Sequence, residues 1–273
     1  MSLLPTMRDT MTDKKLQTPV DINKCIEWVR QAGSIALEHY ENPEMSLKGT
    51  QDYLSQADKQ IENFLIEKLE TNFLGHSILA EESGGNLGLS GFIIDPLDGT
   101  ENFLRKIPMW GICLSFIENK KVTWGIIFNP VTDELFIGRR GQGATLNGKK
   151  LQVSKIRNLN ESCVCLGHSY RTDNIHLHTM MGEFIKNKVS LRLGGSGAIG
   201  LAYVASGRYD AFIEEHLRIW DFIHASIMIE EAGGYFYPFD IDKAVKGGGV
   251  GVGINSELKN KILDIYESTK GKV

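Results

Sequence analysis

The chain has 273 residues, of which 42% are hydrophobic and 23% are charged, and its formal net charge is −4. This composition is ordinary for a globular protein made of one large domain or two closely joined subdomains. No basic run stands out, which argues against nucleic acid as a partner, and no apolar run has the length of about 18 residues that a membrane span needs. We therefore expect neither a nucleic-acid nor a membrane partner.

The N-terminus and the cysteines bear on location. Residues 1–20 are polar after a very short apolar start and lack the apolar core of a secretory signal, so we expect a flexible tail there. The four cysteines show neither disulfide nor zinc spacing. A reduced, cytoplasmic setting fits this pattern best.

Two helices are predicted next, followed by a run of strands. Apolar residues at helical spacing predict a first helix over 21–40, with Asp21 as its N-cap. Ser55 and Asp58 have the spacing of a capping box, so a second helix is expected to begin at Ser55. Strand-like segments separated by short polar or Gly/Pro turns then follow at 77–83, 91–100, 111–118, 121–129 and 134–140. Such short connections favour antiparallel pairing.

We place a boundary near residue 153, after a glycine-rich segment with an Asn147-Gly148 turn signal. It divides an N-terminal subdomain, 21–153, from a C-terminal subdomain, 154–273. In the second part, strands are expected at 162–167, 190–195 and 209–214, and helices at 175–187, 196–206, from 220 onward and at 256–268. Helices and short strands are thus mixed along the chain, and the order is not a simple βαβ repeat.

Acidic residues stand at the boundaries of these predicted elements. Asp58 lies near a helix start, Glu81 and Glu82 end a strand, Asp95 and Asp98 end the next strand, and Asp221 opens a helix. Taken singly, each has an ordinary explanation, as a helix-start residue, a solvated turn or a partner of the helix dipole.

The segment DPLDGT, 95–100, is harder to explain as a plain turn. Pro96 fixes the backbone between the two carboxylates, Gly99 permits a close backbone approach to a ligand, and Thr100 adds a hydroxyl. Backbone N–H groups at such a turn can bind phosphate, and hard oxygen ligands favour magnesium over zinc. If Glu81, Asp95, Asp98 and Asp221 converge, two divalent ions would balance their four charges, and a third is plausible with a bound phosphate. The hypothesis from the residues is metal-assisted hydrolysis of a phosphate ester.

Three ordered motifs strengthen this hypothesis. AEES at 80–83, DPLDGTENF at 95–103 and WDFIHASIMIEEAGG at 220–234 resemble signatures of the inositol monophosphatase family. The resemblance covers roughly residues 20–270. It implies an α+β fold, built as a layered α-β-α-β-α sandwich with mixed and antiparallel sheets. It also implies a magnesium-dependent, lithium-sensitive phosphomonoesterase that acts as a homodimer.

The resemblance also implies a metal site with two or three Mg²⁺ ions. Glu81, Asp95 and Asp98, helped by the Leu97 carbonyl, would hold the first ion, and Asp95, Asp98 and Asp221 the second.

The same resemblance assigns the groups that meet water and phosphate. Glu81 and Thr100 would orient and activate the attacking water, with Asp58 supporting Thr100. The backbone N–H groups of Gly99 and Thr100 would bind the phosphate of a small-molecule ester.

Four residues are expected on the substrate side. Glu214 matches a position where inositol phosphatases often carry an acid, and Gly195 and Ser196 match a turn on the substrate side of the family's site. Ser169 is a further candidate. Inositol monophosphate or a similar polyol phosphate is the expected substrate.

Two departures leave other substrates open. Glu101 stands where inositol phosphatases commonly have Thr or Ser, and Trp110 belongs to a PxWG segment that also occurs in histidinol-phosphate phosphatases. Trp110 could stack on an imidazole or belong to the core or an interface. A histidinol-phosphate, sugar or nucleotide phosphatase is one alternative. A non-catalytic phosphosugar-binding regulator is another, which the loss of a metal-binding acid would favour, but none is lost.

Overall fold

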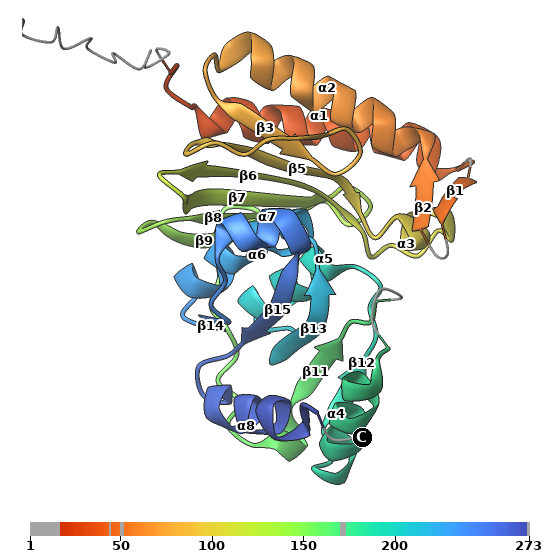
Figure 1. Cartoon of the computed structure of the whole chain (residues 1–273), viewed down its shortest axis with the longest axis vertical. Helices are drawn as coiled ribbons and strands as arrows, with labels where there is room; N and C mark the ends of the chain where they lie inside the picture. The colour runs from red at the N-terminus through yellow and green to blue at the C-terminus, as the bar shows by residue number, and fades with distance from the viewer. Residues whose placement is uncertain (1–16, 44, 50–51, 170–172, 272–273) are drawn as a thin grey trace, which may run out of the picture.

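The structure, a computed structural model, describes residues 17–43, 45–49, 52–169 and 173–271. Its elements stack in five layers of helix, sheet, helix, sheet and helix, as Figure 1 shows, so the predicted α-β-α-β-α sandwich is confirmed. Most of the expected tail, residues 1–16, lies outside the described residues. The last part of it is attached, because Thr18 donates its N–H to the Leu74 carbonyl at 3.1 Å and its own carbonyl lies 2.8 Å from His76 Nε2.

The helices fall into three layers and a few short connecting pieces. Their bounds are α1 Ile22–Tyr40, α2 Gln56–Asn72, α3 Thr100–Leu104, α4 Ile175–Lys186, α5 Gly197–Ala205, α6 Ile219–Glu231, α7 Ile241–Gly247 and α8 Lys259–Thr269, with a 3-10 turn at Leu159–Glu161. The predicted starts of the first two are confirmed, since Asp21 caps α1 and the Ser55–Asp58 capping box begins α2. None of the described helices is both long and apolar enough to cross a membrane.

The described strands form a two-stranded ribbon and two large sheets. The ribbon pairs β1 Met45–Gly49 with β2 Asp52–Ser55. The larger sheet has the order β10-β9-β8-β7-β6-β5-β3-β4, with bounds β3 Ser77–Ala80, β4 Gly84–Gly85, β5 Gly91–Asp98, β6 Gly111–Glu118, β7 Lys121–Asn129, β8 Glu134–Arg139, β9 Gly143–Leu146 and β10 Lys149–Lys150. The smaller sheet has the order β12-β11-β13-β15-β14, with bounds β11 Cys163–Leu166, β12 Ser190–Arg192, β13 Ala211–Leu217, β14 Tyr235–Phe236 and β15 Gly249–Ile254.

Antiparallel pairing is confirmed from β5 through β8 but is wrong for one neighbouring pair. β3 and β5 run parallel, because the segment between them first turns back through the short strand β4. The sequence also gave no signal for β15, which lies between β13 and β14. Its GVGVGI sequence is glycine-rich, and glycine is uncommon in strands. Close packing explains Gly251 and Gly253, since a Cβ would lie 2.4 Å from Leu217 Cδ1 at the first and 2.4 Å from Ile229 Cδ1 at the second.

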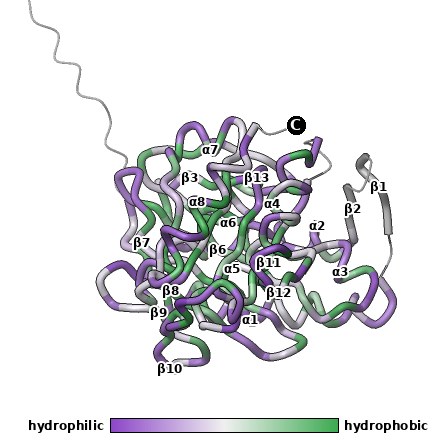
Figure 2. Tube along the Cα trace, turned by 90° about the horizontal axis from the view of Figure 1, so that it is seen from below, coloured by the Kyte–Doolittle hydropathy of each residue, from purple (hydrophilic) through white to green (hydrophobic). Residues whose placement is uncertain are grey.

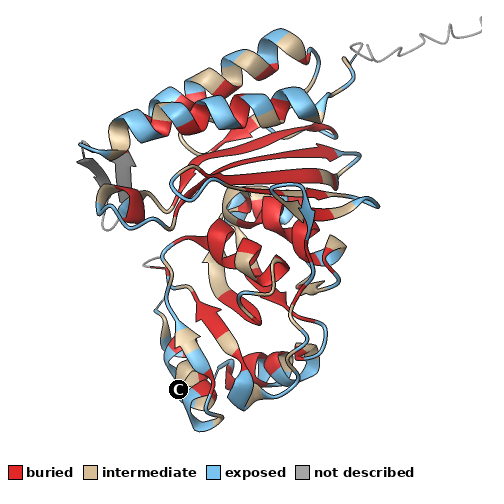
Figure 3. Cartoon of the chain, turned by 180° about the vertical axis from the view of Figure 1, so that it is seen from behind, coloured by how far each residue is buried: buried red, intermediate tan, exposed pale blue. Residues whose placement is uncertain are grey.

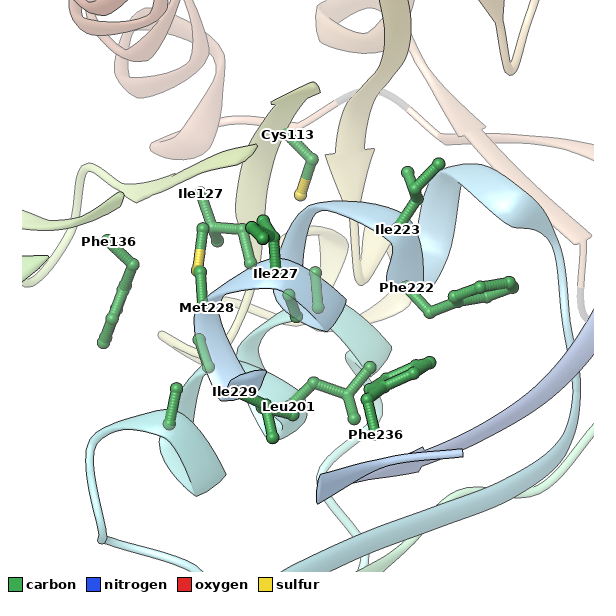
Figure 4. Packing of buried hydrophobic residues seen from close by; sticks show 14 of the residues in the cluster. Cys113, Ile127, Phe136, Leu201, Phe222, Ile223, Ile227, Met228, Ile229 and Phe236 are labelled. Carbon is green, nitrogen blue, oxygen red and sulfur yellow. The ribbon is translucent and has the colours of Figure 1, made fainter. Parts of the chain in front are cut away.

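Three apolar clusters hold the layers together. Helices α1 and α2 pack on one face of the larger sheet, α5 and α6 lie between the two sheets, and α4 and α8 cover the far face of the smaller sheet. Figure 4 shows the middle cluster, where Ile227 and Met228 of α6 approach Ile127 and Phe136 of the larger sheet. Buried residues accordingly fill the strands and the middle helices in Figure 3, and hydrophilic residues gather at the periphery in Figure 2.

The proposed subdomains, 21–153 and 154–273, correspond closely to the two sheets, but whether they behave as separate units stays a prediction. Helix α6, which belongs to the second part, packs on β6, β7 and β8 of the first part. A buried helix therefore joins the two sheets, and both contribute to the pocket described next.

Candidate metal and phosphate site

Three carboxylates from distant parts of the chain meet between the two sheets. Asp95 and Asp98 stand at the end of β5, and Asp221 lies in the first turn of α6. One oxygen of each can be chosen so that the three oxygens lie within 4.8 Å of one another. The predicted convergence of these three acids is therefore present in the structure.

The backbone of β5 and α6 fixes these carboxylates. Strand β5 shifts register against β6 between Asp95 and Asp98, where Pro96 lies, and an Asp95 oxygen accepts the Leu97 N–H at 2.9 Å. Proline is tolerated at such irregularities because it cannot donate a ladder hydrogen bond. Asp221 accepts the Arg218 N–H at 2.7 Å across the helix start.

Burial and mutual repulsion make this cluster unfavourable when all its members are ionised. Asp95 and Asp98 are only 1% and 7% exposed. Burial, followed by the charges of Glu81, Asp98 and Asp221, raises the pKa of Asp95 well above its usual range. Burial also raises the pKa of Asp98, to about 6, although hydrogen bonds from Ser196 and from backbone N–H groups oppose the shift. A divalent cation would relieve this repulsion, and an all-oxygen donor set suits a hard ion, so the residues fit the metal.

Glu81 lies at the same pocket but outside the three-carboxylate group. It follows β3, donates its N–H to the Ile94 carbonyl at 3.2 Å, and contributes a side-chain hydrogen bond to the environment of Asp95. Its side chain lines the 400 Å³ pocket that Asp95, Asp98 and Asp221 also line. The structure thus brings all four predicted metal acids to one cavity.

Thr100 and Asp58 are also brought together. The Thr100 hydroxyl lies 3.0 Å from the Leu97 carbonyl oxygen and 3.3 Å from Asp58 Oδ1, and it donates its single proton between these two acceptors. Asp58 is fully buried, and its other oxygen accepts the Ser55 N–H at 2.8 Å as part of the capping box. The proposed support of Thr100 by Asp58 therefore has a direct contact, whereas ligation of a metal by the Leu97 carbonyl stays a prediction.

Gly99 occupies a position that excludes a side chain. Its φ is 90°, and a Cβ there would lie 3.1 Å from both the Met109 carbonyl oxygen and Ser196 Cβ. The glycine thus allows the two halves of the site to close on each other. Phosphate binding by the N–H groups of Gly99 and Thr100 stays a prediction.

The four predicted substrate-side residues line the same cavity, but they differ in what they contact. Ser196 caps α5 by accepting the Ile199 N–H, and its hydroxyl donates to Asp98. Its side chain therefore contacts the carboxylate cluster. Glu214 is half-buried on β13, and Ser169 is buried, with its carbonyl accepting the Asn174 side-chain amide at 2.9 Å. Gly195 is exposed, with a φ of 75°.

The sequence did not point to Asn102. Its side-chain amide donates to the Met109 carbonyl at 2.7 Å and to the Gly194 carbonyl at 2.8 Å, so it ties the α3 turn to the loop before α5. Asn102 lies two residues after the DPLDGT segment, but the Gly194 loop is far away in the chain, and no spacing rule could have connected the two.

The two departures in the sequence have different outcomes. Trp110 is fully buried and packs against Tyr40 and Phe103 at ring-centroid distances of 5.4 and 5.0 Å. It belongs to the core and cannot stack on a substrate. Glu101 lines the pocket and pairs with Arg105 at 2.8 Å.

The chain thus belongs to a class of layered α+β proteins with a buried carboxylate cluster in a pocket between two sheets. A model of the inositol monophosphatase family matches residues 19–269. The chain therefore belongs to the inositol monophosphatase family.

Sequence relatives and solved structures agree with this assignment. The chain is 35% identical to a Salmonella typhimurium protein named Nus factor SuhB, over 77% of this chain and 82% of that protein. The Escherichia coli protein of the same name is 34% identical, over 80% and 85%. The Bartonella henselae extragenic suppressor protein suhB is 30% identical, with a TM-score of 0.83 over 92% and 99% of the two chains. A Thermotoga maritima IMPase is 26% identical, with a TM-score of 0.82 over 91% and 97%.

Proposed function

We propose that this protein is a magnesium-dependent phosphomonoesterase that hydrolyses inositol monophosphate or a similar small polyol phosphate. The observation that carries the proposal is the meeting of Asp95, Asp98 and Asp221 in a cavity that Glu81 and Thr100 also line. Family membership supports the same reaction class.

The carboxylates would hold the cations. Asp95 and Asp98 would be shared between two Mg²⁺ ions, with Glu81 and the Leu97 carbonyl on one and Asp221 on the other, and a third ion could accompany the phosphate. When bound, the metal supplies positive charge to the phosphate and lowers the pKa of a bound water. Two fold neighbours, 22% and 23% identical, are described as complexes with NADP and Ca²⁺ and with Mg²⁺ and phosphate. The donor set of this chain, rather than that likeness in fold, supports the metal.

The other residues would position the water and the ester. Because the Thr100 hydroxyl donates its proton toward Leu97 and Asp58, its lone pairs remain free to accept a hydrogen bond from the attacking water. Glu81 would accept the proton of that water. The missing side chain of Gly99 lets the phosphate approach the backbone N–H groups of the turn, and Glu214 would accept hydrogen bonds from substrate hydroxyls. Catalysis would then depend mainly on positioning and charge stabilisation.

A phosphate-release screen with Mg²⁺ tests the proposal. It should compare inositol 1-phosphate, histidinol phosphate, fructose 1,6-bisphosphate and adenosine 3′,5′-bisphosphate. We expect the highest kcat/KM for inositol 1-phosphate and no release in EDTA. The burial of Trp110 removes the main sequence argument for histidinol phosphate, so a preference for that ester would contradict the substrate assignment.

A second candidate is a role that does not depend on hydrolysis. The name Nus factor SuhB, which curated relatives at 34–35% identity carry, does not refer to phosphate-ester hydrolysis. Failure of every ester in the screen, together with Mg²⁺ binding, would favour this candidate. The intact set of acids supports the enzyme.

Three further expectations belong with the proposal: a homodimer, inhibition by lithium and a cytoplasmic location. Sedimentation velocity tests the first of these, and titration of the Mg²⁺-dependent activity with LiCl tests the second. Fractionation of the source cells, with the protein detected by antibody, tests the third.

A further inference from the structure

Helix α2 carries a second buried carboxylate, one turn after Asp58. Glu62 is only 2% exposed, and its two oxygens accept backbone N–H groups from the turn after β3. Oε2 accepts the Glu82 N–H at 2.9 Å, and Oε1 accepts the Ser83 N–H at 2.8 Å. Glutamate is rarely buried this completely unless it is paired, and here the partners are two consecutive peptide groups.

These contacts act on the peptide groups around Glu81. The Glu82 N–H belongs to the planar peptide unit that begins with the Glu81 carbonyl. The Glu81 N–H, on the other side, is held by the Ile94 carbonyl at 3.2 Å. Both peptide planes that flank the Glu81 Cα are therefore fixed, and so is the direction in which its side chain leaves the backbone.

Beyond this turn the chain pairs again with β3 through β4, and Glu82 and Ser83 are the turn residues whose N–H groups Glu62 accepts. Gly84 and Gly85 follow with φ values of 75° and 119°, in the region that glycine adopts more easily than other residues. Without the carboxylate, the N–H groups of Glu82 and Ser83 would lose charge-assisted partners, and such bonds contribute more than neutral ones.

We propose that Glu62 is a positioning residue that holds Glu81 in place for the divalent cation, so that α2 positions two parts of the site through Asp58 and Glu62. This inference rests on the proposed function in one respect, the presence of a cation at Glu81. It goes beyond that function because Glu62 does not line the pocket.

The test measures metal binding directly and separately from turnover. Wild-type protein, Glu62→Gln and Glu62→Asp are titrated with Mn²⁺ alone, with the free ion counted by electron paramagnetic resonance. The Mg²⁺ concentration for half-maximal hydrolysis and the KM for the ester are measured in parallel. Glu67→Gln, at an exposed position of the same helix, is the matched control.

The two Glu62 variants separate position from charge. Gln keeps the length but offers only one accepting oxygen, and Asp keeps the charge but is too short to reach both N–H groups. We expect both to weaken Mn²⁺ binding and to raise the Mg²⁺ requirement by about 10-fold, as for other residues that orient a metal ligand, while KM changes by less than about twofold. We expect Glu67→Gln to match wild type.

A double-variant cycle shows whether Glu62 acts through Glu81. In a Glu81→Gln background, Glu62→Gln should change Mn²⁺ affinity by less than about twofold, because coupled residues are not additive. Wild-type Mn²⁺ affinity in folded Glu62→Gln, or a normal Glu62→Asp, would overturn the proposal. If wild type binds Mn²⁺ but hydrolyses no ester, only the proposed function fails, and the comparison of variants still decides the role of Glu62. If wild type binds no Mn²⁺, both proposals fail.

Discussion

The inner and outer sides of the pocket are built differently. On the inner side, Asp95 and Asp98 are nearly inaccessible, and backbone N–H groups hold their oxygens. On the outer side, Ile107 and Leu193 line the same cavity but are 44% and 60% exposed. Buried, hydrogen-bonded groups keep a fixed geometry, whereas exposed ones can change without disturbing the core. We infer that the inner side sets the chemistry and that the outer side sets the choice of substrate.

The largest effect is expected on the inner side, from Asp98→Asn. The change removes a charge from the metal cluster, and metal assistance is worth several kcal/mol, so kcat/KM should fall by about 1,000-fold or more. Phosphate release measures the loss, and circular dichroism checks the fold. Asp264→Asn, at an exposed position of α8, is the control and should retain full activity. Unchanged turnover in Asp98→Asn would remove this residue from the metal site.

The next effect is expected on stability at low pH. It depends on His224, a buried residue of α6, the helix that lies between the two sheets. The helix packs closely on the larger sheet at this residue, since a Cβ on Gly125 would lie 2.3 Å from the His224 backbone oxygen. Burial lowers the pKa of the His224 side chain from 6.5 to about 4. The folded state therefore resists protonation that the unfolded state accepts. This contribution to stability is complete above pH 6.5 and is lost as the pH falls toward 4. The shift in pKa corresponds to a loss of about 3 kcal/mol in the free energy of unfolding over that interval.

Denaturant unfolding at pH 7 and pH 4.5 measures this contribution. His224→Gln should lose less stability than wild type over that interval, and His178→Gln, at an exposed position of α4, should behave as wild type. An equal acid-induced loss in wild type and His224→Gln would show that this histidine does not control the response.

A smaller effect is expected on the outer side, from Glu214→Gln. The half-buried carboxylate is replaced by an amide of similar size, so a hydrogen bond to a substrate hydroxyl weakens, and KM should rise by about fivefold with little change in kcat. Steady-state kinetics with inositol 1-phosphate provide the measurement, and Glu118→Gln at the end of β6 is the control. A large loss of kcat instead would place Glu214 among the groups that act on the reaction.

The smallest effect is expected from Glu101→Thr at the rim. The Glu101–Arg105 pair spans 2.8 Å, but the two side chains are 48% and 61% exposed. Exposed helix pairs of this spacing contribute about 0.5 kcal/mol or less, so the free energy of unfolding should barely change. Thermal unfolding gives this value. A decrease of more than about 1 kcal/mol in the free energy of unfolding would show that this exposed pair stabilises the fold more than surface ion pairs usually do.

Local patterns predicted much of the molecule because their causes are local. The apolar spacing of α1, the capping box of α2 and the strand that ends in DPLDGT all depend on residues a few positions apart. The fold class followed from the resemblance that the motifs carry. The glycine-rich strand β15 was missed because distant segments leave no room for side chains there, as at Gly253, where a Cβ would lie 2.4 Å from Ile229 of α6 and 3.0 Å from Leu201 of α5.

By itself, the sequence determined which residues are candidates for binding metal and phosphate, since the acids supply oxygen ligands and Pro96 and Gly99 restrict the backbone of the turn that carries them. Only the tertiary structure decided which of them meet. It brought Asp221 to Asp95 and Asp98, turned the Ser196 hydroxyl toward Asp98, and placed Glu62 under the turn that carries Glu81. These contacts depend on the packing of α6 and α2 against the larger sheet, and packing between distant segments leaves no spacing in the sequence.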